Sequence, residues 1–300
     1  MLKIAYHPIY KLPLPEGHRF PMLKYDLLPK QLLFEGTCSQ ENFFEPLLPN
    51  KNLVLKVHSK EYFNNLIELH LTKKEVRKIG FPLDHLLVER EQIIADGTIK
   101  ACDYALEYGI AMNIAGGTHH AYSNRGEAFC LLNDQAIAAR YLQNEKKAKK
   151  ILIIDLDVHQ GNGTAEIFQN DSSVYTFSMH GANNYPFKKE VSDLDIALEK
   201  GTSDKEYLDI LAKVLPNLIN SIKPDFIFYL CGVDILSTDK LGTLAVSHEG
   251  CKKRDEIVIS TCAKHGIPIQ CSMGGGYSPR IKDIINAHAN TFRIAQEVFF

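Results

Sequence analysis

Two aspartates and a histidine alternate with apolar residues directly after an apolar run. The segment ILIIDLDVHQGNG, residues 151–163, places Asp155, Asp157 and His159 at every second position. In a strand, residues two positions apart point to the same side. Carboxylates and imidazoles bind divalent metals, and a catalytic zinc ion takes three protein ligands while a fourth position stays open. The spacing therefore predicts a metal site with Asp157 and His159 as two of its ligands.

Another carboxylate occupies a similar setting later in the chain. Asp234 follows the apolar run DFIFYLCG, residues 225–232, and we expect it to be the third ligand. An isolated aspartate at such a place more often caps a helix or closes a turn. That interpretation does not suit three ionisable groups at the end of a core strand, because each buried charge costs several kcal/mol without a partner. Asp155 lies one pleat deeper and is expected to bind a neighbouring group or a monovalent ion behind the metal.

Two histidines and a tyrosine could supply proton chemistry beside such a metal. His119 and His120 lie in GGTHHA, and imidazole titrates near neutral pH. Tyr277 follows the glycines at 274–276, and a phenol O–H suits the stabilisation of an oxyanion that develops on a carbonyl. This glycine run lacks the spacing and the lysine of a nucleotide site. Taken alone, each histidine is more often structural, and Tyr277 could equally be a packed aromatic residue.

Each of these polar segments follows a short apolar run that indicates a strand buried on both faces. Stretches with helical spacing lie between the runs, and this alternation predicts parallel βαβ units. In an open parallel sheet, ligands bind beyond the carboxyl ends of the strands, so four strands bring their polar residues to one edge. The predicted strands cover residues 2–6, 109–115, 150–158, 173–179, 225–232 and 267–273.

Helices are predicted at 131–150, 203–222 and 248–266, and each has a recognisable start or end signal. Asn133 or Asp134 is a suitable N-cap for the first, which ends in lysines. A capping box of Ser203 and Glu206 opens the second, and Pro216 is expected to kink or split it. Gly266 is expected to end the third.

Length and composition set broad limits. The 300 residues are 45% hydrophobic and contain no linker-like segment, which favours one domain over residues 1–300. The net charge of -2 gives no reason to expect nucleic acid or an anionic membrane as partner. The start of the chain lacks the apolar region of a signal peptide, and no run is long enough to span a bilayer. Seven cysteines without a C-x-x-C pair indicate a reduced, cytoplasmic protein. The oligomeric state is not indicated.

Taken together, the motifs resemble those of the histone deacetylase superfamily. GGTHHA, AFCLLND, DLDVHQGNG, CGVD and GGGYS occur in its order and spacing, and PEGHRFPMLKY at 15–25 is most similar to the class IV branch and its bacterial relatives. The resemblance implies the arginase/deacetylase fold, an α/β architecture with a parallel sheet of about eight strands and helices on both faces. It also implies hydrolysis of an acyl-lysine amide, acetyl or longer, with Zn(II), or Fe(II) as the alternative metal.

The resemblance assigns a role to each candidate residue. His120 matches the general base, His119 matches its partner, paired with Asp155, and Tyr277 matches the tyrosine that polarises the carbonyl. The metal ligands match Asp157, His159 and Asp234. A potassium site matches Asp155, Asp157, His159, Ser178 and Met179. Phe129 matches one wall of the substrate tunnel, and Gly275, Gly276 and Tyr185 are further candidates to line it.

Two positions differ from the class I pattern. Asn162 stands where class I enzymes have an aspartate beside the second histidine, and Gln160 stands where they have a further histidine. An amide carries no net charge, so His120 is expected to be less basic than in a His–Asp pair. Class IV proteins share this asparagine, so it indicates the branch and not a loss of activity.

Three other functions are conceivable for this set of residues. A ureohydrolase of the same fold needs two manganese ions and further carboxylates, which GGTHHA and CGVD do not supply. A catalytically silent module that binds acyl-lysine is disfavoured because every candidate catalytic position holds a competent residue. Deacetylation of small acylated amines such as polyamines stays open, since it changes the substrate and not the chemistry.

Overall fold

The core of the fold is one sheet of eight strands, and the computed structural model describes all 300 residues. Every neighbouring pair of strands is parallel, in the order β2-β1-β3-β8-β7-β4-β5-β6. The predicted parallel sheet is therefore confirmed. The strands are β1 (Lys3–Ala5), β2 (Phe43–Phe44), β3 (Ile110–Asn113), β4 (Ile151–Asp155), β5 (Val174–Gly181), β6 (Leu194–Leu198), β7 (Phe226–Leu230) and β8 (Ile269–Ser272).

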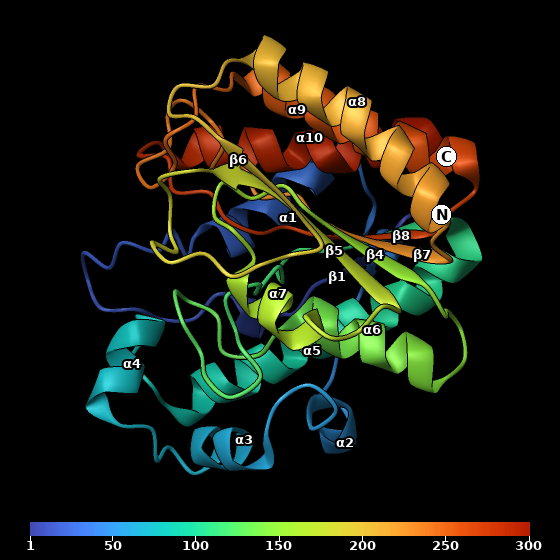
Figure 1. Cartoon of the computed structure of the whole chain (residues 1–300). Helices are drawn as coiled ribbons and strands as arrows, with labels where there is room; N and C mark the ends of the chain where they lie inside the picture. Colours follow the sequence, from blue (N-terminus) through green and yellow to red (C-terminus); the bar gives the residue numbers. More distant parts are fainter.

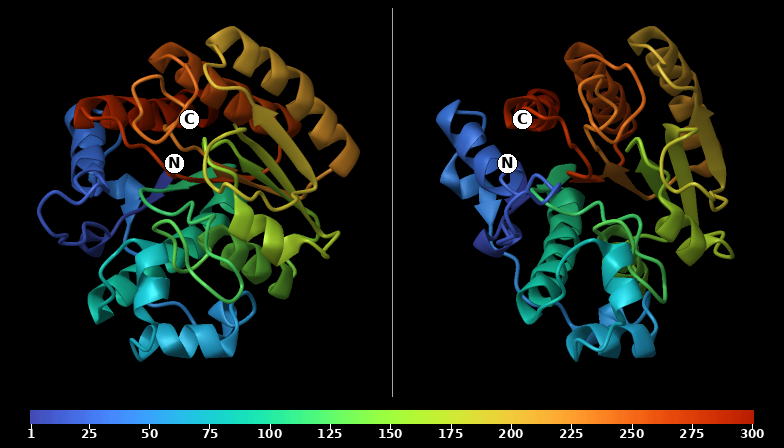
Figure 2. Two further views of the ribbon diagram at one scale, coloured as in Figure 1. Left: turned by 60° about the vertical axis from the view of Figure 1, so that its left-hand side comes forward. Right: turned by 90° about the vertical axis from the view of Figure 1, so that its left-hand side faces the viewer.

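Helices cover both faces of this sheet (Figure 1). One face carries α1 (Lys24–Phe34), α8 (Asp204–Ile222), α9 (His248–His265) and α10 (Ile281–Phe299). The other carries α5 (His85–Tyr108), α6 (Asp134–Asn144) and α7 (Asn162–Phe168). Three short helices lie beyond α5 in both figures, namely α2 (Lys51–Val54), α3 (Lys60–Ile67) and α4 (Lys73–Ile79) (Figure 2). None of the helices has the length and apolar character that a membrane crossing requires.

All six predicted strands are present, and the two that the sequence did not reveal lie at the edges of the sheet. β2 has only two residues, and most of β6 is partly exposed. Edge strands lack the continuous apolar run of a strand buried on both faces, so their sequence signal is weak.

The strand predicted at 150–158 ends earlier than expected. β4 stops at Asp155, and the amide of Leu156 makes the last strand-like bond to the Leu230 carbonyl, at 3.1 Å. The next two amides donate to side chains, Asp157 N–H to Asp155 Oδ1 at 3.1 Å and Val158 N–H to Asp234 Oδ1 at 2.9 Å. Asp157 therefore lies in a loop, and the prediction that a strand pleat aligns it with the histidine two positions on is wrong.

The predicted helix ends are confirmed with two changes. Asn133 caps α6, Ser203 and Glu206 form the capping box of α8, and Gly266 ends α9 with φ +63°. The first helix stops at Asn144, before the lysines. Pro216 lies inside α8 and does not split it.

One buried arginine ties the helical layer to the carboxyl edge of the sheet. Arg254 of α9 is fully buried, and its guanidinium donates to the carbonyls of Leu156, Cys231 and Gly232. Its Nε donates to Asp255 Oδ1 at 2.9 Å. These carbonyls precede two of the candidate ligands, so a single side chain holds both loops in register.

We expect Arg254→Met to lower the free energy of unfolding by about 3–5 kcal/mol, because it leaves the Asp255 carboxylate buried without its cation. Urea unfolding followed by circular dichroism measures this. The matched control is Arg77→Met on the exposed face of α4, which should change stability by about 0.5 kcal/mol or less. Equal effects of the two substitutions would contradict the role given to Arg254.

Candidate active site

Four adjacent strands supply the candidate site. β3, β8, β7 and β4 are neighbours in the middle of the sheet, and their carboxyl ends lead into loops 114–120, 273–277, 231–234 and 156–161. The residues singled out in GGTHHA, GGGYS, CGVD and DLDVHQGNG therefore lie along one edge. This is the edge at which parallel α/β sheets bind their ligands.

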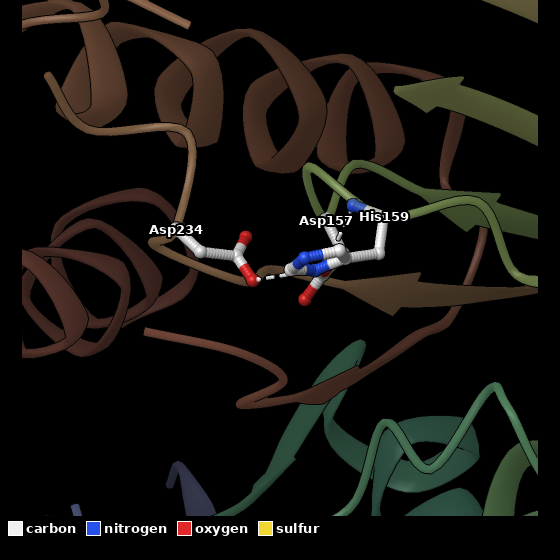
Figure 3. A group of neighbouring side chains, drawn as sticks. All are labelled: Asp157, His159 and Asp234. Carbon is white, nitrogen blue, oxygen red and sulfur yellow. Dashed lines mark hydrogen bonds and ion pairs between the residues drawn. The ribbon is translucent and has the colours of Figure 1, made fainter. Parts of the chain in front are cut away.

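Asp157, His159 and Asp234 form a compact buried cluster (Figure 3). Their candidate ligand atoms all lie within 4.8 Å of one another. Nδ1 of His159 lies 3.0 Å from Asp157 Oδ1 and 3.2 Å from Asp234 Oδ2. Figure 3 shows the Asp234 carboxylate facing the imidazole from the opposite loop. The tertiary structure thus brings the three predicted ligands together from two strands.

Backbone amides hold these carboxylates in place. Asp157 Oδ1 accepts the amide of His159 at 3.0 Å, and Asp157 Oδ2 accepts the amide of Gly275 at 2.9 Å. Asp155 Oδ1 accepts the Asp157 amide at 3.1 Å. Side-chain oxygens therefore shape the loop after β4, in place of the strand ladder that ended at Asp155.

The chemistry of this donor set fits a divalent cation. Asp234 Oδ2 is buried, and His159 Nδ1, 3.2 Å away, is not oriented to donate a hydrogen bond to it. Burial and the neighbouring Asp157 charge raise the pKa of Asp234 to about 7, and the contact with His159 only partly offsets this rise. A Cβ atom on Gly275 would lie 2.0 Å from Asp234 Oδ2 and 2.7 Å from Asp157 Oδ2, so only glycine leaves room there. Two carboxylates and one imidazole suit Zn(II) and also Fe(II).

His119 lies next to a carboxylate. Its Nδ1 is 2.6 Å from Asp155 Oδ2, and both side chains are buried. Burial lowers the pKa of His119, but the charge of Asp155 and the hydrogen bond to it outweigh that effect and raise the pKa overall. This histidine therefore favours its protonated form.

His120 lies next to an amide, and a short chain of hydrogen bonds defines its tautomer. The Tyr122 hydroxyl donates to Glu190 Oε1 at 3.2 Å and accepts from Asn162 Nδ2 at 2.9 Å. The Asn162 oxygen therefore faces His120 Nδ1, 2.6 Å away, which must carry the proton. Burial lowers the pKa of His120, and the neighbouring histidines His119 and His159 lower it further. His120 is thus neutral, with Nε2 free to accept a proton.

Tyr277 follows the glycine turn after β8. Its amide donates to Asp239 Oδ2 at 2.6 Å, and its ring lies 6.4 Å from the His159 ring. Burial raises the pKa of the Tyr277 phenol well above its usual value, and Asp234 raises it further. The hydroxyl therefore remains a hydrogen-bond donor at neutral pH.

Lys24 braces the same turn from the start of α1. It is fully buried, and its Nζ donates to the Gly274 carbonyl at 2.9 Å. The ammonium also lies 5.2, 5.4 and 5.8 Å from the ring centroids of Phe20, Tyr25 and Tyr277. No carboxylate forms an ion pair with Lys24. Aromatic faces attract a cation, so the three rings stabilise the buried ammonium instead.

A cavity of about 380 Å³ leads to the site. Phe129 and Tyr185, both predicted as tunnel walls, line it together with His120, His159 and Tyr277. The Tyr185 ring lies 5.0 Å from that of His120, nearly perpendicular to it.

Phe129 adopts φ +69°, which is uncommon for a bulky residue. Backbone hydrogen bonds from Ala128 to Lys78 and from Phe129 to Ile79 hold this conformation. The loop thereby aims the aromatic ring at the cavity.

The remaining predicted residues take different places. Gly275 lines a small inner pocket of about 40 Å³ beside the cluster, whereas a Cβ on Gly276 would point at Val233 and away from the passage. Ser178 pairs with Asp155 in the β4–β5 register, and Met179 follows it, so these members of the predicted potassium site are adjacent and buried. Potassium binding there stays a prediction.

Several positioning residues have no recognisable signal in the sequence. Tyr122 and Glu190 are 68 positions apart, and Lys24 and Gly274 are 250 apart, so no local pattern connects them. Lys24 is buried at the start of α1, and the sequence gives no sign that this lysine is buried. Asp239 accepts the amide of Tyr277, but in the sequence it cannot be distinguished from an aspartate that closes a turn.

Comparison with known proteins supplies the family. Residues 18–292 match the histone deacetylase domain. An uncharacterised protein of Picosynechococcus sp. is 45% identical over 296 residues, 99% of either chain. Histone deacetylase 2 of Arabidopsis thaliana is 32% identical over 270 residues, 87% of this chain and 70% of that protein. The crystal structure of an HDAC homologue complexed with SAHA has a TM-score of 0.85 at 25% identity, covering 99% of this chain and 84% of that one. The chain therefore belongs to the histone deacetylase family and is a hydrolase of acyl amides.

Proposed function

We propose that this enzyme removes acyl groups from lysine side chains of proteins by metal-dependent hydrolysis. One observation carries the proposal: a histidine paired with a carboxylate, a histidine paired with an amide and a phenol line one small pocket beside the buried Asp-His-Asp cluster. Amide hydrolysis needs a metal or other electrophile, a base for water and a donor for the oxyanion. This edge of the sheet offers a residue for each.

Asp157, His159 and Asp234 would hold Zn(II), with Fe(II) as the alternative. Bound metal would supply the Lewis acid for the acyl carbonyl and for the attacking water. Asp155 supports this cluster from behind through the Asp157 amide. The same carboxylate and Ser178 would contribute to a potassium site, as the family resemblance suggests.

His120 acts as the general base in this proposal. Its Nε2 accepts a proton from water as the water oxygen forms a bond to the acyl carbon. When the carbon–nitrogen bond breaks, the same proton passes from His120 to the leaving lysine amine. The products are a carboxylate and a free amine. Asn162 and Tyr122 keep Nδ1 protonated throughout, so the base cannot adopt the wrong tautomer.

Tyr277 and His119 stabilise charge. The Tyr277 hydroxyl donates to the acyl oxygen as that oxygen becomes negative. His119, protonated beside Asp155, keeps a positive charge next to the reacting groups without giving up its proton.

The aromatic walls support a linear substrate. Phe129 and Tyr185 flank the cavity, and flat rings on two sides suit the unbranched methylene chain of lysine. Asn162 in place of the class I aspartate favours the class IV branch.

A panel of lysine peptides with acetyl through long-chain acyl groups tests the function, and release of free lysine peptide from one of them supports it. No turnover of any peptide by metal-loaded protein would refute it.

We expect Asp234→Ala to lose both bound metal and activity, because it removes one of three ligands. Elemental analysis of purified protein measures metal per chain. Asp209→Ala, an exposed aspartate on α8, is the control and should keep both. If Asp234→Ala still binds one metal ion per chain, the ligand assignment is wrong.

We expect Tyr277→Phe to lower kcat by about a hundredfold, since it removes one donor to the oxyanion. Metal content should not change, because the hydroxyl is not a ligand. Steady-state kinetics with the best peptide measures the effect, and Tyr108→Phe at the end of α5 serves as control. A variant with wild-type kcat would exclude this role for Tyr277.

We expect Asn162→Asp to move the acidic limb of the pH–rate profile to higher pH. The pKa of His120 is lowered in the wild type, so the base is neutral well below pH 7. A carboxylate in contact raises a neighbouring histidine pKa by about 1–3 units, so more of the base is protonated at pH 6 and kcat/KM falls there relative to pH 8. Asn220→Asp, on the exposed side of α8, should leave the profile unchanged. An unshifted limb in Asn162→Asp would show that His120 is not the base.

A further inference from the structure

The lining of the cavity includes permanent cations but no carboxylate. Thirteen residues line the cavity of about 380 Å³, and the two that are permanently charged are Arg19 and Lys78. Neither aspartate nor glutamate is among the thirteen. A substrate that enters must therefore pass two positive side chains.

Arg19 is exposed and makes no ion pair. Its guanidinium carbon lies 4.9 Å from the centre of the Phe129 ring, which places the charge directly over the tunnel wall. The neighbouring residues fix its backbone, because His18 Nε2 contacts the Gly80 carbonyl at 2.9 Å and Phe20 is buried. The charge of Arg19 is thus available to a ligand at a defined place.

Lys78, in the last turn of α4, is only partly neutralised. Its Nζ lies 3.4 Å from Glu127 Oε1. Glu127 also accepts hydrogen bonds from Tyr185 and Arg125, so one carboxylate serves two cations and a phenol. The rim therefore keeps an excess of positive charge.

Two exposed apolar side chains lie in the loop between β5 and β6. Phe187 is 91% exposed and lines the cavity, and Val191 is 80% exposed. The Phe187 ring lies 6.4 Å from that of Tyr185, so it extends the aromatic wall to the outside. Such an apolar surface next to a binding cavity suits contact with a polypeptide beyond the acyl-lysine itself.

We propose that this mouth selects acyl-lysine in polypeptide segments with acidic residues nearby and disfavours acylated polyamines. The inference rests on the proposed function and specifies its substrate class. An acylated polyamine keeps at least one ammonium group at neutral pH, and that cation would meet Arg19 and Lys78. A glutamate beside the acyl-lysine would meet the same two charges with the favourable sign.

The test compares kcat/KM for peptides that differ only at the two residues flanking acetyl-lysine: Glu, Gln or Lys. Acetyl-lysine monomer and N-acetylspermidine complete the panel. At low salt we expect the acidic peptide to exceed the basic one by about fivefold or more, and N-acetylspermidine to be the poorest substrate. The preference should shrink between about 0.05 M and about 0.5 M NaCl, because salt screens exposed charges.

Charge reversal identifies the residues responsible. The double variant Arg19→Glu with Lys78→Glu should invert the order of the acidic and basic peptides. The control, Lys60→Glu with Lys213→Glu, changes net charge equally at exposed sites on α3 and α8 that do not line the cavity. It should keep the wild-type order, and thermal unfolding should confirm that both variants are folded.

The outcomes separate the two proposals. Equal rates for acidic and basic peptides, or a preference for N-acetylspermidine or the monomer, overturn this inference and leave amide hydrolysis standing. Inversion of the order by the control variant overturns the assignment to Arg19 and Lys78. Absence of hydrolysis of every substrate overturns the proposed function and this inference with it.

Discussion

Asp155, Asp157 and Asp234 lie inside the protein at the carboxyl edge of the sheet, with at most 3% of their surface exposed. Carboxylates buried to this extent are stable only with hydrogen bonds and positive charge close by. The amides of Val158 and Gly275 point at them, and the loop after β4 bends around their oxygens. These carboxylate oxygens need hydrogen-bond donors. That need explains why the backbone pairing of β4 ends at its carboxyl end and why Gly275 lies in the loop after β8.

Buried cations complete the arrangement without touching the candidate ligands. Arg254 donates to carbonyls that precede Asp157 and Asp234, and Lys24 donates to the carbonyl of Gly274 before the tyrosine turn. Each cation is itself held, one by a neighbouring aspartate and one by aromatic rings. Three loops that carry functional groups are therefore fixed before substrate arrives, as electrostatic preorganisation requires.

Adjacent histidines acquire opposite properties from their neighbours. His119 contacts a carboxylate and favours its charged form, whereas His120 contacts an amide and favours its neutral form. Enzymes commonly divide acid and base roles between two titratable groups by giving them environments that move their pKa values in opposite directions. The positive rim at the mouth of the cavity acts separately, because it is exposed to solvent and influences which substrate enters, not how the amide is cleaved.

The sequence by itself determined the six internal strands and the residues that follow them. Strands buried on both faces produce apolar runs, and charged residues directly after such runs stand out, as Asp157 and Asp234 do. The reason expected for the alignment of Asp157 with His159 was nevertheless wrong, since side-chain hydrogen bonds in a loop, and not a pleat, bring them together. Only the tertiary structure decided that β3, β8, β7 and β4 are neighbours, that Tyr122 orients Asn162, and that Lys24 and Arg254 brace the loops. These contacts join residues from 22 to 250 positions apart, and no local periodicity or spacing specifies such pairs.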